Sequence, residues 1–290
     1  MSIDELEAEH GASAEDVSLV ERFAGAHDLT VGAVNAGRRT VVLSGTLASL
    51  SAAFSTELLM HDTPSGRFRM RTGPLYVPAE LAGVVEGVFG LDDRPAATPK
   101  FRYPSARVLT AYTPIQVGSA YGFPTGLDGT GECIALIELG GGFKTADLDA
   151  YFSSLKIAPT PTVTAVGVDG GKNAPTGDPQ GPDGEVVLDI EVAGGIAPGA
   201  KLAVYFAPNT DQGFLNAINA AIHDKVQKPS VISISWGSEE PNWTQQSLDA
   251  FNQAFHNAAL LGITVCAAAG DDGSSDGAPD GSANVDFPAS

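Results

Sequence analysis

The sequence predicts a chain in two parts, a small α+β domain followed by a larger α/β domain with a mostly parallel sheet. In the second half, helical stretches separate four continuous apolar runs: "ECIALIEL", "KLAVYFAP", "SVISISWG" and "GITVCAAAGD". Apolar runs without alternation are typical of strands buried on both faces, and strands that are separated by helices favour a parallel sheet. The first half lacks such runs, and a segment rich in Pro and Ala separates the two parts.

Short helical and strand segments fill the first part. The stretch "SAEDVSLVERFAGAHD" has apolar residues at helical spacing, and Ser13 is placed to cap its start. The stretch "TVVLSGTLASLSAAFSTEL" begins as a β-branched strand and passes through Gly45 into a helix. Residues 1–93 are therefore expected to form one α+β domain.

The segment between the two parts is expected to be accessible. Its sequence, "DDRPAATPKFRYPSARVLTAYTP", is rich in Pro and Ala and carries four basic residues: Arg94, Lys100, Arg102 and Arg107. Such a composition predicts an exposed linker at residues 94–110, open to proteolysis, with the α/β domain over residues 111–290.

Charge and composition exclude several classes of protein. The chain has 290 residues, of which 43% are hydrophobic, enough for a sizeable core, and a net charge of −19. Residues 111–290 hold 21 acidic against 6 basic side chains, which argues against nucleic acid or an anionic membrane as partner.

No apolar run is long enough to span a membrane, and the acidic N-terminus does not resemble a signal peptide. The only cysteines, Cys133 and Cys266, lie in apolar runs and predict two buried thiols.

Two acids stand four residues apart in "GPDGEVVLDIEV". On a helix this spacing places Glu185 and Asp189 on one face. Such pairs usually lie on solvated faces, yet here most neighbouring positions are apolar: Val186, Val187, Leu188, Ile190 and Val192. Glu191 points away from the pair and is expected to be the solvated acid. Since like charges held together shift their pKa values, a functional pair and a solvated helix face are about equally supported by the residues alone.

Further polar residues stand where the predicted strands end. Glu138 ends the run "ECIALIE", Trp236 follows "SVISIS", and Asp271 follows "TVCAAAG". In parallel sheets, chemistry sits beyond the carboxyl ends of the strands. An EF-hand beginning at Asp272 fits poorly, because its third and twelfth positions hold Ser and Ala, which leaves a turn or an active site. None of the five histidines follows a predicted strand, so a hydrolase built on this chain would not use histidine as its base.

Long contiguous motifs resemble one known family. They are "TAYTPIQVGSAYGFP", "CIALIELGGGF", "PTGDPQGPDGEVVLDIEVAGGIAPGAKLAVYFAPNT", "SVISISWG" and "AAAGDDGSSDG". In these motifs the chain resembles the sedolisins, the serine-carboxyl peptidases, and in particular their kumamolisin branch. The resemblance implies a subtilisin-like fold over residues 111–290, preceded by a ferredoxin-like propeptide domain within about the first 100 residues.

The resemblance also implies roles for the three acids. Glu185 matches the family's general base, Asp189 the acid that orients it, and Asp271 the acid of the oxyanion hole. Below about pH 5 a histidine is protonated and cannot act as a base, whereas a glutamate with a pKa near 4.3 titrates in that range. A protonated aspartic acid can donate a hydrogen bond to a developing oxyanion. The implied activity is hydrolysis of peptide bonds in acid.

The same resemblance implies a substrate path and an inhibitor. Ser235, Trp236 and Gly237 would line the path of a peptide or protein substrate, with Glu138 a partner for Trp236. The propeptide would act as an intramolecular inhibitor until the linker is cut between about Arg102 and Tyr112. By resemblance we also expect a secreted monomer.

The chain departs from the family pattern in several places. The nucleophile of the family is a serine in a G-T-S-x-x-x-P motif, and the 290 residues contain no such motif. We therefore expect these residues alone to be inactive, with both domains incomplete, and we expect the family's calcium site to lie beyond residue 290. Asp272 stands where the kumamolisin pattern has serine.

Three functions can be weighed on these features. The leading hypothesis is the zymogen of an acid endopeptidase. The alternative is a non-catalytic pseudoenzyme or an inhibitor-like peptide-binding module, which would have no need for all three acids. A conventional peptidase with Asp, His and Ser is excluded by the lack of a suitably placed histidine.

Overall fold

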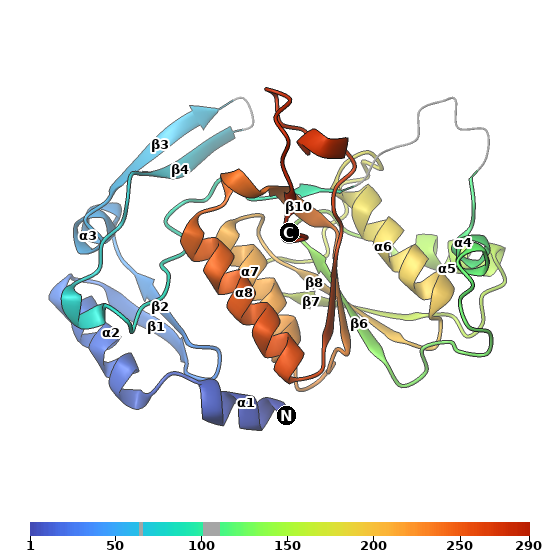
Figure 1. Ribbon diagram of the computed structural model, residues 1–290, viewed down its shortest axis with the longest axis horizontal. Coiled ribbons are helices and arrows are strands. Elements are labelled where there is room, and N and C mark those ends of the chain that lie inside the picture. The colour runs from blue at the N-terminus through green and yellow to red at the C-terminus, as the bar shows by residue number, and fades with distance from the viewer. Residues whose placement is uncertain (64–65, 101–110) are drawn as a thin grey trace. The chain divides into compact units, whose positions relative to one another are not determined.

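A computed structural model describes residues 1–63, 66–100 and 111–290. The chain divides into two compact units, shown as a ribbon in Figure 1. The first unit comprises Met1–Pro95, Thr210–Gln212 and Gln245–Leu261, and the second comprises Ala96–Asn209, Gly213–Thr244 and Gly262–Ser290. Among the described residues, no helix is both long and apolar enough to span a bilayer.

The first unit has the α+β composition that the sequence predicts. Its helix α2 is capped by Ser13, whose side chain accepts a hydrogen bond from the Asp16 amide, as expected. Its strands pair as two antiparallel ladders, β1 with β2 and β3 with β4. In chain order its elements are α1 (Ile3–His10), α2 (Ala14–Ala26), β1 (Thr30–Asn35), β2 (Thr40–Ser44), α3 (Leu47–Ala53), β3 (Glu57–Thr63), β4 (Gly66–Thr72), the 3-10 helix η1 (Ala79–Leu81) and α8 (Gln245–Leu260).

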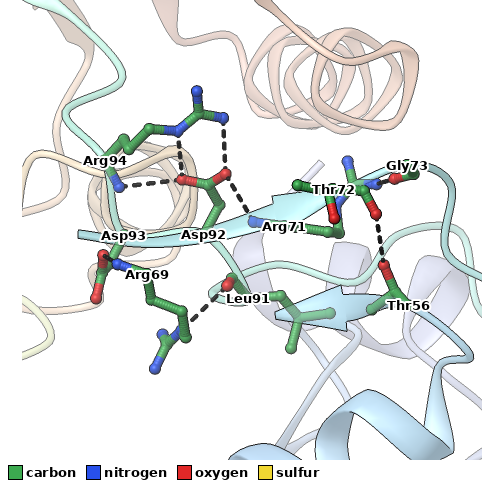
Figure 2. A network of polar contacts seen from close by, with 9 residues as sticks. All are labelled: Thr56, Arg69, Arg71, Thr72, Gly73, Leu91, Asp92, Asp93 and Arg94. Carbon is green, nitrogen blue, oxygen red and sulfur yellow. Dashed lines mark hydrogen bonds and ion pairs between the residues drawn. The ribbon is translucent and has the colours of Figure 1, made fainter. Parts of the chain in front are cut away.

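A polar network ties the end of this unit to strand β4 (Figure 2). The Arg94 guanidinium donates to both Asp92 carboxylate oxygens, at 2.8 and 2.7 Å, and the Arg71 amide donates to the same carboxylate. Burial opposes ionisation of Asp92, but the hydrogen bonds from Arg94 outweigh it, and the pKa of Asp92 is lowered. One residue further on, the Arg69 amide donates to Asp93 at 2.5 Å. Residues that precede the predicted linker are therefore fixed to the propeptide-like unit.

The second unit is built on the five-stranded sheet that the apolar runs predict. The strand order is β11-β9-β6-β8-β7, and every neighbouring pair is parallel. Strand β7 was not predicted, because its sequence "TVTAVG" alternates and lies at the sheet edge. The elements of the second half, apart from α8, are β5 (Thr98–Pro99), α4 (Pro114–Ala120), β6 (Cys133–Glu138), α5 (Thr145–Ser154), β7 (Thr162–Gly167), α6 (Pro182–Ile196), β8 (Lys201–Phe206), α7 (Asp211–Ile222), β9 (Val231–Ile234), β10 (Trp236–Glu239), η2 (Glu240–Asn242), β11 (Thr264–Ala267), η3 (Gly273–Ser275) and β12 (Asp286–Phe287).

Helix α6 is the element that positions the predicted acids. Val186 and Ile190 are fully buried in an apolar core shared with β6, α5 and β8, while Leu188 and Val192 are exposed. The core consists of Leu136, Phe143, Leu148, Phe152, Val186, Ile190, Leu202, Val204 and Phe206. Because the helix is fixed through these buried side chains, its first turn is held at one end of the sheet.

Three expectations differ from the structure. Cys266 is exposed, because β11 is an edge strand with one solvated face, and only Cys133 is buried. Glu191 is half-buried, and burial raises its pKa to about 7, so it is not a fully solvated acid. The predicted exposed linker is already in a strand at Thr98–Pro99, with Ala97 buried, while residues 101–110 lie outside the described residues.

A substitution at Gly194 tests the packing of α6. A Cβ at this position would lie 2.8 Å from Phe152 Cζ and 2.9 Å from Pro161 Cγ. Helix propensity favours Gly→Ala by about 1 kcal/mol, but overpacking costs about 1–3 kcal/mol. Gly194→Ala should therefore lower the free energy of unfolding, measured by urea denaturation, by roughly 1–2 kcal/mol.

Gly25 in α2 provides the control, since a Cβ there meets nothing within 4 Å. Gly25→Ala should raise stability by a few tenths to about 1 kcal/mol. Equal stabilisation by both substitutions would contradict the close packing of α6.

Candidate active site

The start of helix α6 lies against the loop that follows strand β6. Helix α6 begins at Pro182, which supplies a favourable φ and needs no amide partner. Asp183 accepts hydrogen bonds from the Gly177 amide at 2.7 Å and from Thr176 Oγ1 at 3.1 Å, which fixes the loop entering the helix. Gly141 has a φ of +69°, and a Cβ there would lie 2.7 Å from the Asp183 nitrogen. Glycine at this position lets the two loops approach.

Three carboxyl groups meet at this end of the sheet, and we call Glu138, Glu185 and Asp189 the carboxyl cluster. Ser235 Oγ lies 2.9 and 2.8 Å from the two carboxylate oxygens of Asp189, and a further hydrogen bond joins Asp189 to Glu185. Trp236 Nε1 donates to Glu138 Oε2 at 2.9 Å, as expected. Glu138 is 0% and Glu185 1% exposed, so both acids are removed from water.

Burial changes the acidity of all three groups. It raises the pKa of Glu185 to about 8, with further increases from the charges of Asp189 and Asp271. Burial likewise raises the pKa of Asp189 to about 6, although hydrogen bonds from Ser235 and Glu185 act in the opposite direction. The pKa of Glu138 is raised well above its ordinary value, mainly by burial and then by the charge of Asp189. The expectation of a glutamate that titrates near 4.3 is wrong here, because the cost of a buried charge dominates.

Asp271 lies near the carboxyl cluster but belongs to a different element. It follows strand β11, and its charge acts on Glu185. Both Asp271 and Asp272 are exposed. The structure thus brings Asp271 within electrostatic range of a buried acid that precedes it by more than 80 residues.

The predicted peptide path is occupied by the chain itself. Strand β10 pairs antiparallel with β5, with Trp236 opposite Pro99 and Gly237 opposite Thr98. The Lys100 amide donates to the Ser235 carbonyl at 2.7 Å. All three residues predicted to line the path therefore contact Thr98–Lys100.

Comparison with known proteins finds matches to both parts of the chain. A family profile described as the pro-kumamolisin activation domain matches residues 1–94, and the subtilase family profile matches residues 156–290. Kumamolisin from Bacillus sp. (strain MN-32) is 53% identical over 97% of this chain, which spans 53% of that protein. This chain is a homologue of the sedolisins.

Other sedolisins extend the likeness at lower identity. Sedolisin from Pseudomonas sp. (strain 101) is 29% identical over 87% of the chain and 46% of that protein. A solved structure of Pseudomonas sedolisin, described as a serine-carboxyl proteinase complexed with two molecules of pseudo-iodotyrostatin, matches with a TM-score of 0.54 and 26% identity. That match covers 62% of this chain and 51% of the other. The chain spans about half the length of these relatives.

Sequence reasoning missed a buried ion cluster next to the peptide path of this sedolisin homologue. Lys100 Nζ lies 3.3 Å from Asp276 Oδ1 and also pairs with Asp286. The side chains of Lys100, Asp276 and Asp286 are 6%, 3% and 0% exposed. Burial raises the pKa of Asp286 to about 6, against the opposing effect of Lys100. Three residues from distant segments leave no periodic signal, so the sequence gave no sign of this cluster.

Within residues 1–63, 66–100 and 111–290, no group of three or more His, Cys, Asp or Glu side chains is arranged to hold a metal ion.

The raised carboxyl pKa values predict greater stability in acid. The native state holds protons on Glu185, Glu191, Asp189 and Asp286 up to pH 6–8, whereas unfolded carboxyls release them near pH 4. This contribution is fully present below about pH 4 and is lost as the pH rises through 6 to 8. The free energy of unfolding, measured by urea denaturation, should therefore fall between pH 5 and pH 8.

Glu185→Gln should make this fall shallower by on the order of a few kcal/mol, because glutamine carries no charge to bury. Asp149→Asn, at an exposed position on α5, should leave the pH profile as it is. Stability that increases from pH 5 to pH 8 in the unmodified protein would contradict the assignment.

Proposed function

We propose that this chain forms the propeptide and the acid half of the active site in a serine-carboxyl endopeptidase that hydrolyses peptide bonds in acid. The observation that carries the proposal is the hydrogen-bonded pair of Glu185 and Asp189 in the buried carboxyl cluster, beside a strand that binds an extended peptide segment. Sequence identity of 53% to kumamolisin supports the same reaction class.

In this mechanism Glu185 is the general base. Its carboxylate takes the proton of a serine hydroxyl while the serine oxygen attacks the carbonyl carbon of the substrate. The same proton then passes to the leaving amine, and water repeats the sequence to release the acyl group. Both acids hold a proton at pH 4, so the pair must first release one proton to solvent; with the remaining proton on Asp189, Glu185 is the carboxylate that acts as base. Ser235 keeps Asp189 oriented in this pair.

Asp271 is proposed as the donor to the oxyanion. The protonated form of a carboxyl group can donate a hydrogen bond to the oxygen that becomes negative in the tetrahedral intermediate. Its exposure leaves the carboxyl accessible to a bound peptide, and its charge already influences Glu185. Asp272, next to it, carries no assigned role.

The first unit is proposed to act as an intramolecular inhibitor. Its sequence matches the pro-kumamolisin activation domain, and the residues that follow it occupy strand β10 as an extended peptide would. Lys100, held by Asp276 and Asp286, adds a charged anchor to this occupation. Cleavage between about Arg102 and Tyr112 would free strand β10 for a peptide or protein substrate. Within that stretch, residues 102–110 lie outside the described residues.

The remaining components are proposed by likeness to the relatives. The nucleophile would be a serine in a segment that these 290 residues do not contain, and a calcium ion would bind outside them as well. We propose a secreted monomer that does not bind nucleic acid or a membrane, in keeping with a net charge of −19.

The base assignment is tested in a full-length protein that contains these residues and the family's serine. Glu185→Gln keeps the shape of the side chain but cannot take a proton. Cleavage of a chromogenic peptide at pH 4 should fall by a factor of about 10² or more.

The matched control is Glu191→Gln on the same helix. Because burial raises the pKa of Glu191 to about 7, this acid is already neutral at pH 4, and glutamine should preserve activity. Full activity of Glu185→Gln, with an unchanged circular dichroism spectrum, would refute the base assignment.

A second test uses the 290 residues by themselves. Without a nucleophile they should cleave no peptide at any pH between 3 and 7, while a synthetic peptide substrate should still compete for the groove. Hydrolysis by the purified 290-residue chain that is lost in Glu185→Gln would show that a residue within it acts as nucleophile. Peptide binding without hydrolysis in the full-length protein would instead favour the non-catalytic peptide-binding module.

A further inference from the structure

One asparagine, Asn209, contacts the backbone of Ala96 and Ala97, the two residues that precede β5. Asn209 Oδ1 accepts hydrogen bonds from the amides of Ala96 and Ala97, both at 3.1 Å. Asn209 Nδ2 donates to the Ala97 carbonyl at 2.8 Å. Asn209 lies in the loop after strand β8 and is half-buried. A carboxamide both donates and accepts, so it can pair with a peptide chain as a strand edge does.

A second side chain, that of Ser238, binds the same part of the backbone. Ser238 Oγ, on strand β10, donates to the Ala96 carbonyl at 3.0 Å. Together, Asn209 and Ser238 satisfy both amides and both carbonyls of Ala96 and Ala97. None of these four hydrogen bonds involves an alanine side chain, so the contact does not depend on the residue type.

The same contacts are therefore open to any extended peptide that follows this path. The path is continuous: Ala96 and Ala97 lead into the ladder with β10, and the Lys100 amide binds the carbonyl of Ser235, whose hydroxyl contacts Asp189. Asn209 thus binds the backbone three to four residues before Lys100, whose amide contacts Ser235 beside the carboxyl cluster.

We propose that Asn209, with Ser238, forms a remote subsite that binds the backbone of extended peptide substrates, three to four residues N-terminal to the position of Lys100. This inference rests on the proposed peptidase function. Asn209 is a positioning residue for substrate, since it does not touch the reacting atoms. The site selects for peptide length and extended conformation and not for side-chain identity, in contrast to the buried acids around Lys100.

One arm of the test needs no catalysis and uses the 290-residue chain. Asn209→Ala should speed hydrogen exchange of the Ala96 and Ala97 amides by about tenfold or more, because both lose their acceptor. Asn242→Ala, whose side chain bonds Glu239 and not the segment, should leave these rates as in the unmodified chain. Equal exchange rates in all three proteins would show that Asn209 does not protect these amides, and would overturn the inference.

The closing experiment uses the full-length protein and two peptide substrates at pH 4. The first is the acetylated peptide of residues 96–114 of this chain, and the second is the same peptide with L-lactate in place of Ala97, which changes only the amide N–H to an ester oxygen. Unmodified enzyme should cleave the ester-containing peptide with a kcat/KM about 5- to 10-fold lower, mainly through KM. In Asn209→Ala this ratio between the two peptides should fall to within about twofold, while Asn242→Ala keeps the ratio of the unmodified enzyme.

The outcomes separate the inference from the proposed function. A ratio that persists in Asn209→Ala, with both peptides weakened equally, would mean that Asn209 only supports its loop, and would overturn the inference. If Asn209→Ala does not fold, Asn209→Leu, which is close in shape and lacks polar atoms, gives the same comparison. Cleavage of neither peptide by the unmodified full-length protein, despite binding, would overturn the proposed peptidase function instead.

Discussion

The structure depends on the burial of the carboxyl cluster at one end of the parallel sheet. Glu138 Oε1 and Glu185 Oε2 are buried without a hydrogen-bond partner among the described residues. An ionised carboxylate in such a place is costly, so these groups retain protons and their pKa values rise. The second half of the chain adds to this cost at neutral pH, because residues 111–290 hold 21 acidic and only 6 basic side chains. Acid relieves both the local and the overall repulsion.

This electrostatic cost shapes the rest of the site. Ser235 and Trp236 supply hydrogen bonds to Asp189 and Glu138; Trp236 begins strand β10, which pairs with β5, and Ser235 directly precedes it. The same short segment therefore stabilises the acids and pairs with Thr98–Pro99. In the proposed function, a substrate bound along β10 would lie next to the acids, and its position would be coupled to the hydrogen bonds that orient Asp189.

The contact of residues 96–100 with β10 and its neighbours relies on backbone hydrogen bonds along most of its length and on one charged side chain. Asn209, Ser238 and the ladder of β10 bind the backbone of Ala96–Pro99. Lys100 is the exception, because its ammonium group is buried between two carboxylates. Both partners of this buried ion pair lose their hydration, which offsets much of their mutual attraction. In the proposed function, such backbone contacts suit an inhibitor that later gives way to substrates of other sequences.

The sequence by itself determined the periodic features of this protein. Continuous apolar runs predicted the strands β6, β8, β9 and β11, and the four-residue spacing of Glu185 and Asp189 placed both acids on one face of α6. These predictions succeed because strand burial and helix geometry repeat locally along the chain. Tertiary structure alone decided what depends on distant segments meeting: the raised pKa of Glu185, the burial of Lys100 between Asp276 and Asp286, and the contact of Asn209 with Ala96 and Ala97. Desolvation and long-range hydrogen bonds depend on which segments pack together, and residue type and spacing carry no record of that.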